Sequence, residues 1–333
     1  MTDDPNIPPI SSDALDRLRF DAARLAKSGN MGAHMRRRHG QSLEFREYRE
    51  YIIGDDVRHV DWRTSLRHGM KNDLLVKTFE AEEKLTVAVS IDPRSSMYLP
   101  EDHYAGSSDF QRGSKMQVAC WLLLVIAELA AIERDTLLIH RLFREKGMPG
   151  EAVQAGEIDT ARRVVTDLVS ASPRGEGDWD RLYEVNDEAL QQALPPASVL
   201  IVLSDFYALD DRFIEMLHLA QGSYREVILI ALDSWPVEAA RLGSRPLSRI
   251  SGLEGIIFSD PLTQIDDEFL RSTENNLNLH LDKLLTEGQA GGLYMDRWPW
   301  PGLAEGHAGL LRASFQERLL ACKRLATVFV RNV

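Results

Sequence analysis

The sequence predicts an α/β protein built on a doubly wound, mainly parallel sheet, with a charged module on its N-terminal side. Short β-branched runs alternate with amphipathic helical patterns between residues 84 and 233, as in parallel sheets joined by right-handed crossovers. Two of these runs stop at an acid, at Asp92 and at Asp205. The stretch before them, residues 31–79, is dense in charges of both signs and lacks this alternation. We therefore expect one sheet domain and one separate charged module.

The composition limits the protein classes. With 333 residues, 44% of them hydrophobic, the chain can bury an ordinary core. Its net charge of −12 argues against general affinity for nucleic acids or anionic membranes, which need a basic face. Cys120 and Cys322 are too few for a disulfide framework or a thiolate metal site, so we expect buried free thiols.

The sequence shows no targeting or membrane-spanning pattern. The amino terminus has no basic region followed by an apolar core, so no signal peptide is expected. The longest apolar run, residues 120–132, contains Glu128 and is shorter than the ~20 residues that a membrane span needs. We therefore expect a cytoplasmic protein without a membrane span.

The first 79 residues divide into a tail with a helix and the charged module. Residues 13–27 have apolar side chains at helical spacing, so 1–30 are assigned to a polar tail and a first helix. In residues 31–79 acids and bases alternate so closely that mutual ion pairs explain the pattern better than a nucleic-acid patch does. We expect a separate ion-paired module in which Trp62 is mostly buried and helps to hold the charges together.

Four side chains in this module could in principle surround a metal ion: Asp55, Asp56, His59 and Asp61. They would be the site of catalysis if the chain were a divergent metal-dependent enzyme. The simpler interpretation is that these carboxylates accept hydrogen bonds from backbone amides and from Arg58, Arg63 and Arg67, with Trp62 as a packing anchor. The sequence contains no GxSxG, Walker, HExxH or CxxC motif. A binding role is therefore favoured, and the enzyme remains the alternative.

The α/β domain is assigned to residues 80–260. Its predicted strands are 85–92, 136–143, 198–204 and 226–232, with a weaker strand at 255–259. Its predicted helices are 114–134, 158–170, 181–193 and 209–220. The apolar face of the helix at 114–134 is so broad that we expect it to be buried against the sheet.

Residues 261–333 are assigned to a C-terminal helical extension. A helix is predicted over 266–287 and another over 310–330. Between them, Trp298 and Trp300 stand among prolines, and the sequence does not indicate what this segment does. The last helix either packs back on the sheet or serves a partner.

The acids at the ends of two strands predict a functional corner. Asp92 is followed by Arg94 and Ser96 in a polar loop, and Asp205 follows another apolar run. The carboxyl ends of parallel strands meet at one edge of the sheet, and ligands bind there in open α/β sheets. We therefore expect Asp92 and Asp205 to form an anionic corner.

A set of spaced motifs resembles the conserved block of a bacterial family called domain of unknown function 58. The motifs are Gly32, His34 and Gly40; Glu44 and Phe45; YxxGDDxRxxDW from Tyr51 to Trp62; Arg67; LLVKTFEAE at 74–82; Asp92 with Ser96 and Met97; and Ser204, Asp205 and Phe206. The resemblance covers roughly residues 31–260. The motif residues assigned to interactions are Gly54, Asp55, Asp56, Arg58, Asp61, Trp62 and Arg67.

The resemblance implies a fold and a partner. Members of the family are described as carrying a von Willebrand factor A-like domain, and they occur beside MoxR-type AAA+ ATPases. We therefore expect a non-enzymatic adaptor that binds such an ATPase. The resemblance does not indicate which ATPase, and the sequence does not fix the oligomeric state.

The resemblance also implies a metal-ion-dependent adhesion site, which has D-x-S-x-S after the first strand, a threonine in a later loop and an aspartate after the fourth strand. Asp92, Ser96 and Asp205 match this pattern. Arg94 stands at the place of the first serine, and Asp178 is nearest the place of the threonine.

These departures predict a degenerate metal site that holds Mg²⁺ weakly or not at all. Mg²⁺ needs oxygen ligands, whereas a guanidinium offers only donors and a competing positive charge. Arg94 is therefore predicted to act as a cation surrogate among Asp92, Asp205 and Asp178. In the alternative, Asp178 points inward, Arg94 turns to solvent, and the extra carboxylate replaces the lost hydroxyls. No other cofactor is expected.

Overall fold

A computed structural model provides the structure of the chain. It describes residues 8, 10–11, 13–17, 44–51, 57–67, 74–80, 85–100, 114–132, 135–140, 142–145, 154–156, 158–170, 183–185, 198–207, 218, 226–244, 247–249, 262–290, 293–300, 308–322, 325 and 328. The chain divides into two compact units. The smaller unit is residues 31–84, and the larger one combines residues 1–30 with 85–333.

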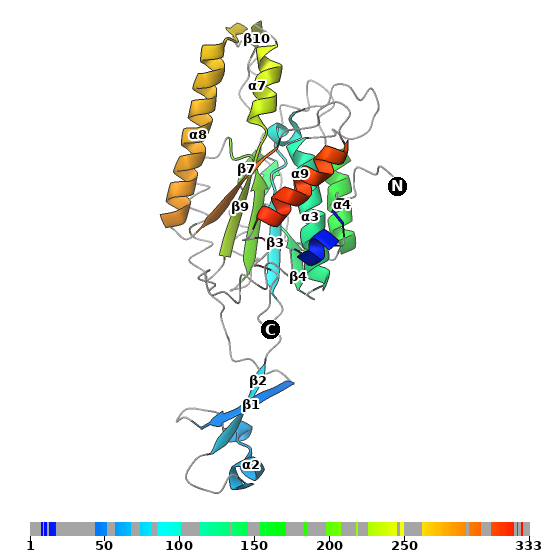
Figure 1. The fold of residues 1–333 in the computed structure, drawn as a ribbon, viewed down its shortest axis with the longest axis vertical. Helices are drawn as coiled ribbons and strands as arrows, with labels where there is room; N and C mark the ends of the chain where they lie inside the picture. Colours follow the sequence, from blue (N-terminus) through cyan, green and yellow to red (C-terminus); the bar gives the residue numbers. More distant parts are fainter. Residues whose placement is uncertain are drawn as a thin grey trace. The chain divides into compact units, whose positions relative to one another are not determined.

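The larger unit is built on a six-stranded sheet (Figure 1). Along the chain its strands are β3 (Thr86–Ile91), β4 (Thr136–Ile139), β6 (Gln154–Gly156), β8 (Val199–Ser204), β9 (Glu226–Asp233) and β12 (Tyr294–Pro299). Their order across the sheet is β12-β9-β8-β3-β4-β6, and all neighbours are parallel except β4 and β6. When the six strands are renumbered 1 to 6 in chain order and read from the β6 edge, this is the order 3-2-1-4-5-6 of doubly wound sheets. The predicted α/β, mainly parallel sheet is confirmed.

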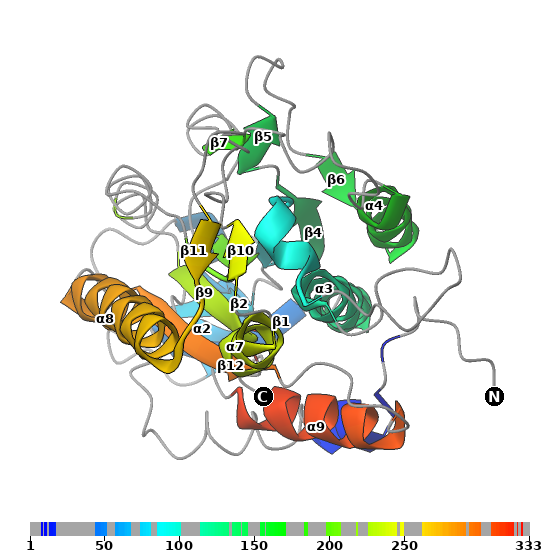
Figure 2. The ribbon, with the colours of Figure 1, turned by 90° about the horizontal axis from the view of Figure 1, so that it is seen from above.

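Helices cover both faces of the sheet (Figure 2). The core of one face includes side chains of α3 (Lys115–Ile132), α4 (Ile158–Ser170) and α9 (Ala308–Ala321), and that of the other includes side chains of α8 (Asp267–Ala290). The strands supply both cores because successive side chains of a strand point to opposite faces. Val87 and Val89 of β3 belong to the first core and Ala88 to the second.

The helix α3 is central to this packing. Fifteen of its residues are buried. It corresponds to the helix predicted over 114–134. It is also the one helix among the described residues that is long and apolar enough to cross a membrane, but 83% of it is buried inside the fold. Such burial is typical of a helix that packs in the core against a sheet.

The tryptophan segment is part of the core. Trp298 and Trp300 are 3% and 1% exposed. The ring of Trp300 lies 6.1 Å from that of Trp121 in α3, and the ring of Trp298 lies 5.6 Å from that of Phe315 in α9. Part of the segment assigned to a C-terminal helical extension therefore belongs to the sheet domain, because it supplies β12 to the sheet and aromatic side chains to its core.

Two predicted elements differ from the structure. The strand predicted over 136–143 ends at Ile139, and the Leu142 N–H donates to the side-chain oxygen of Ser90 at 3.3 Å. The next residues form β5 (Phe143–Glu145), which pairs antiparallel with β7 (Tyr183–Val185). The helix predicted over 181–193 was therefore wrong at residues 183–185, where aromatic and β-branched side chains favour a strand.

Other predicted elements were confirmed or fall outside the described residues. The helices at 158–170 and 266–287 correspond to α4 and α8. A short helix, α7 (Trp235–Gly243), follows β9, and β10 (Leu247–Arg249) pairs with β11 (Leu262–Gln264). The strand predicted at 255–259 and the helix at 209–220, apart from residue 218, lie outside the described residues.

The smaller unit contains a two-stranded antiparallel sheet and a short helix. Its elements are β1 (Glu44–Glu50), the 3-10 helix η1 (Val57–His59), α2 (Trp62–Arg67) and β2 (Leu75–Glu80). Val60 and Val76 are buried, and the Ser65 side chain of α2 accepts a hydrogen bond from the Leu75 N–H at 2.9 Å. The prediction that Trp62 is mostly buried was wrong, because its side chain is 55% exposed. The inward side of α2 carries Ser65, so Trp62 and Leu66, one turn apart, face outward.

Candidate functional site

Three aspartates mark the carboxyl edge of the sheet. Asp92 follows β3, Asp205 follows β8, and Asp233 ends β9, the next strand. The order of the strands reverses between β3 and β8, since the chain runs from β3 to β4 on one side and reaches β8 on the other. This reversal is the point at which doubly wound sheets bind ligands. The structure therefore brings Asp92 and Asp205 to one edge, and adds Asp233.

The carboxylate of Asp92 is bound by Arg94. Both groups are buried, with side-chain exposures of 0% and 9%. The Arg94 Nε lies 2.9 Å from Oδ1 and 3.0 Å from Oδ2, and the Arg94 backbone N–H donates to Oδ1 at 3.0 Å. A second guanidinium nitrogen pairs with Oδ2. The guanidinium carbon also lies 5.3 Å from the centre of the Phe143 ring. Arg94 thus turns inward and engages both oxygens of Asp92.

Ser204 joins the end of β8 to Asp92. Its hydroxyl donates to Asp92 Oδ2 at 2.7 Å and accepts the N–H of Phe206 at 3.0 Å. Phe206 has a φ of 55°, in the left-handed region that side chains rarely adopt. Its carbonyl accepts a hydrogen bond from His280 Nε2 of α8 at 2.9 Å. Bonds on both sides of Phe206 therefore hold the turn that carries Asp205.

Asp205 faces a different cation, Lys115 of α3. Lys115 Nζ lies 3.0 Å from Asp205 Oδ2 and 2.9 Å from Oε1 of Glu238 in α7. The side chains of Lys115 and Asp205 are 0% exposed. Asp205 Oδ1 accepts the N–H of Tyr207 at 3.2 Å, and Lys115 Nζ lies 4.5 Å from the centre of the Tyr207 ring.

The charges of this pair support each other. Burial by itself raises the pKa of Asp205, but the positive charges of Lys115 and Arg94 outweigh it and hold that pKa below its ordinary value of 3.8. Burial likewise lowers the pKa of Lys115, but Asp205 and Glu238 outweigh it and hold that pKa above 10.5. Both groups are therefore charged at neutral pH.

Asp233 has a third cation, Arg297 of β12. Arg297 donates to Asp233 Oδ2 through Nε at 3.1 Å and through a terminal nitrogen at 2.8 Å, and to Oδ1 of Asn278 at 2.7 Å. Asp233 Oδ1 accepts the Tyr207 hydroxyl at 3.0 Å. Burial, with the negative charges of Glu238 and Asp233, raises the pKa of Tyr207, so its hydroxyl stays a donor. Each of the three aspartates is thus neutralised by a side chain of the same protein.

The carboxylate oxygens at this edge are already engaged by cationic side chains of the protein. Mg²⁺ needs near-octahedral oxygen ligands at about 2.0–2.1 Å. Both oxygens of Asp92 accept N–H groups of Arg94, and Lys115 lies against Asp205. Ser96 is buried at 3% exposure in the same loop, and Asp178 lies outside the described residues. No group of three or more histidine, cysteine or acidic residues in the described part of the chain could hold a metal ion.

In the smaller unit, Asp61 organises the motif residues that the structure describes. It accepts the backbone N–H of Arg63 at 3.1 Å and of Thr64 at 3.0 Å, the hydroxyl of Tyr48 at 2.9 Å and an ion pair from Lys77 at 3.0 Å. The Thr64 amide, followed by Lys77 and Tyr48, lowers the pKa of Asp61.

The other motif residues of this unit are placed differently. Arg58 and Arg67 are exposed on η1 and α2. His59 belongs to η1, but its side chain lies outside the described residues, as do Gly54, Asp55 and Asp56. Of the four side chains of the alternative metal site, the structure therefore describes only that of Asp61. The predicted backbone amide donors to Asp61 are present, and its ion-pair partner is Lys77, which the sequence did not single out.

Sequence reasoning missed Lys115, Asp233, Glu238 and Arg297. A signal existed for Asp233, because the run EVILIALD also ends at an acid, like those before Asp92 and Asp205. Lys115 is the one charge at the start of a long apolar helix, which hinted at a buried partner. Glu238 and Arg297 had no signal, since each is a common charge on an ordinary helix or strand.

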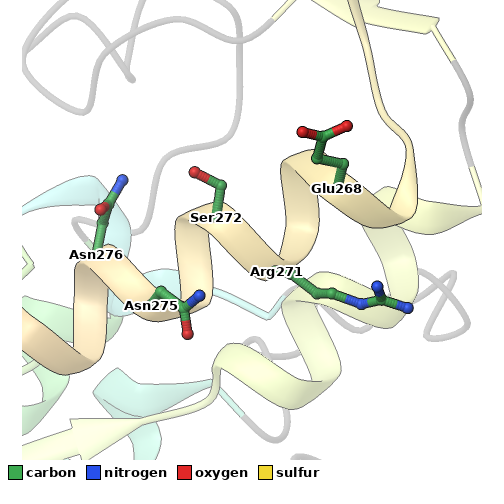
Figure 3. Close-up of a pocket in the computed structure, with 5 residues that line it drawn as sticks. All are labelled: Glu268, Arg271, Ser272, Asn275 and Asn276. Carbon is green, nitrogen blue, oxygen red and sulfur yellow. The ribbon is translucent and has the colours of Figure 1, made fainter.

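Two further features of the larger unit offer no reactive group. A depression on the surface of α8 is lined by Glu268, Arg271, Ser272, Asn275 and Asn276 (Figure 3). All five side chains are exposed, so it encloses no reactive group. Cys120 and Cys322 are buried free thiols, as predicted. Burial raises the pKa of Cys120 to about 12 and raises that of Cys322 as well, so neither is a nucleophile at neutral pH.

Comparisons with known proteins identify a family. No curated protein matches the chain. One similar solved structure is an aerotolerance-related membrane protein from Bacteroides fragilis NCTC 9343, with 11% identity and a TM-score of 0.34 over 72% of this chain and 98% of that one. Another is the conserved hypothetical protein BatB from Bacteroides thetaiotaomicron, with 11% identity and a TM-score of 0.35 over 71% of this chain and 98% of that one. The family model for the protein of unknown function DUF58 matches residues 47–238, which is more than half of the chain. The chain belongs to the DUF58 family, as its motifs indicated.

Proposed function

We propose that this protein is a non-enzymatic interaction protein that docks onto a partner through the carboxyl edge of its sheet. One observation carries the proposal: this edge, where doubly wound sheets bind ligands, is filled by ion pairs between the protein's own side chains. Arg94 engages both oxygens of Asp92, and Lys115 lies against Asp205. Paired charges of this kind are poor general bases and poor nucleophiles. A docking surface requires only that the edge keep its shape.

The partner we propose is a MoxR-type AAA+ ATPase. Membership of the DUF58 family supports this, together with the match of Asp92, Ser96 and Asp205 to the motif of von Willebrand factor A-like domains, which occur beside such ATPases in this family. This partner is inferred from family analogy. In this proposal both proteins are located in the cytoplasm, where ATP is available.

The test is co-elution of the purified full chain with a MoxR-type ATPase from the same organism. Size-exclusion chromatography is run with ATP, with ADP and without nucleotide, and a complex is expected that depends on the nucleotide. Arg94→Ser should weaken it, whereas Arg271→Ala, on the exposed side of α8, should not. Absence of a complex in every nucleotide state would overturn the proposal.

We also propose that Arg94 replaces the metal ion of the degenerate site. The pairing of its guanidinium with both oxygens of Asp92 supports this. Titration calorimetry with Mg²⁺ and Mn²⁺ should show no binding to the wild type and binding to Arg94→Ser. Tight binding to the wild type would refute the role of Arg94, whereas binding to Arg94→Ser alone would show the arginine standing in for the ion.

The alternative enzyme has less support. It would use Asp61 as a metal ligand, but the carboxylate of Asp61 is engaged by Lys77, Tyr48 and two backbone amides. No observation on the described residues favours a second function over the interaction protein.

A further inference from the structure

The ammonium group of Lys115 is enclosed on several sides at the carboxyl end of β8. Its side chain is 0% exposed. Nζ contacts a carboxylate oxygen of Asp205 at 3.0 Å and one of Glu238 at 2.9 Å, and it lies 4.5 Å from the centre of the Tyr207 ring. Two carboxylates and an aromatic face are the groups with which proteins recognise an ammonium ion.

The walls of this enclosure are held by bonds that do not involve the lysine. Asp205 Oδ1 accepts the Tyr207 N–H at 3.2 Å. The Tyr207 hydroxyl donates to Asp233 at 3.0 Å, and the Ser234 hydroxyl donates to Glu238. The site is therefore formed by the loop after β8 and the start of α7, and removal of the lysine side chain leaves these bonds in place.

The position of Lys115 is otherwise unfavourable for a positive charge. It is the first residue of α3, an 18-residue helix, and the amino end of a helix carries a partial positive charge. Complete burial also disfavours the charged form of a lysine. The two carboxylates overcome both effects. With two negative charges around one positive charge, the enclosure retains a net preference for a cation.

We propose that the carboxyl end of β8 is an organic-ammonium site that the chain fills with the side chain of Lys115, so that Asp205 has its own cation, whereas Arg94 is the cation of Asp92. A divalent cation such as Mg²⁺ requires about six oxygen ligands, and an aromatic face does not serve it. An ammonium ion uses the aromatic face as well as the carboxylates. The proposal concerns the cation of the isolated chain, so it stands or falls independently of any partner.

The test is chemical rescue of Lys115→Ala. This substitution removes the atoms of n-propylammonium and leaves the two carboxylates unpaired. Its Tm should fall by roughly 5 to 15 °C relative to the wild type. Added n-propylammonium chloride should restore most of the loss, whereas 1-propanol, which has the same size without the charge, and NaCl at equal ionic strength should not. The wild type and Lys283→Ala, which truncates an exposed lysine of α8, should not respond.

Three results would overturn the proposal. The first is a Tm of Lys115→Ala equal to that of the wild type. The second is equal rescue by 1-propanol, which would show that only volume matters. The third is rescue by Mg²⁺ at lower concentration than by n-propylammonium, which would show that the enclosure prefers a metal ion.

A second measurement keeps the proposal testable if Lys115→Ala does not fold. In the wild type, Lys115 should resist acylation by acetic anhydride under conditions in which Lys283 reacts, as followed by mass spectrometry. Glu238→Gln keeps a group that accepts the Ser234 hydroxyl but removes one negative charge, and should increase the acylation of Lys115 severalfold. Acylation of Lys115 in the wild type as fast as that of Lys283, or no change in Glu238→Gln, would contradict an ammonium site.

Discussion

Each of the two units contains an aspartate–lysine pair at the same distance. Lys115 and Asp205 of the larger unit lie 3.0 Å apart, as do Lys77 and Asp61 of the smaller one. The side chains of the first pair are 0% exposed, and those of the second are 39% and 14% exposed. Distance alone therefore does not tell what a pair contributes. A buried charge has lost its hydration and depends on its partner for stabilisation, whereas an exposed charge is also hydrated by solvent.

The largest expected effect comes from breaking the buried pair. Lys115→Met leaves Asp205 buried beside Glu238 without their lysine, and should lower the free energy of unfolding by about 3 to 5 kcal/mol. Urea denaturation gives this value. Lys77→Met is the matched control, and its effect should be far smaller and should fade as salt is added. Equal effects of the two substitutions would show that burial does not separate the pairs.

The stability difference between the wild type and Lys115→Met should depend on pH. In the wild type, Lys115 and Arg94 hold the pKa of Asp205 below 3.8, so the contribution of Asp205 is present above that pH and is lost as the pH falls through its lowered pKa. In Lys115→Met, burial dominates and raises the pKa of Asp205. The stability difference between wild type and variant should therefore shrink as the pH is lowered from about 7 to about 3. A difference that stays constant over this range would contradict the assignment.

The next effect concerns the bond between neighbouring strand ends. Ser204→Ala removes the hydroxyl that donates to Asp92 at 2.7 Å and accepts the Phe206 N–H. Because a hydrogen bond to a charged group contributes about 1.5 to 3 kcal/mol, a loss of this size is expected in urea denaturation. Ser272→Ala, on the exposed side of α8, is the control and should change little. A neutral Ser204→Ala would mean that Arg94 alone satisfies Asp92.

The sequence predicted those parts of the site that follow from topology. Carboxyl ends of parallel strands share an edge, so two apolar runs ending at Asp92 and Asp205 were sufficient to bring these residues together. Arg94 belonged to the same motif, and its donor-only chemistry was readable from its residue type. The sheet itself followed from alternating strand and helix patterns, which reflect burial on both faces.

The remaining parts depend on packing that leaves no local pattern. Lys115 reaches Asp205 only because α3 packs with its first residue near the end of β8, 90 positions along the chain. Arg297 reaches Asp233 because β12 joins the sheet beside β9. For Trp62, composition suggested burial, but the position inside α2 that faces β2 is taken by Ser65. A tryptophan is usually buried, but in this short helix the buried position belongs to Ser65 and Trp62 faces outward.

The exposed pair should act locally. Asp61→Ala removes the acceptor of the Arg63 and Thr64 amides at the start of α2, together with the partner of Lys77. Hydrogen exchange of residues 62–67 should become faster, because these amides lose their cap, while exchange in α3 should not change. The control is Asp159→Ala, whose exposed carboxylate pairs with Arg162 on α4. Slower or unchanged exchange in α2 would show that Asp61 is not what holds this helix.

The smallest expected effect is that of Trp62→Ala. Because its side chain is 55% exposed, truncation creates no cavity, and the free energy of unfolding should change by no more than about 0.5 kcal/mol. Trp300, 1% exposed and in edge contact with Trp121, is the matched tryptophan, and Trp300→Ala should cost about 3 to 5 kcal/mol. The fluorescence of Trp62 is obtained as the difference between the wild type and Trp62→Phe. Acrylamide should quench this fluorescence, because the side chain is exposed. A loss in Trp62→Ala close to that in Trp300→Ala would mean that the smaller unit is stabilised by its aromatic side chain after all, rather than by the polar contacts of Ser65 and Asp61.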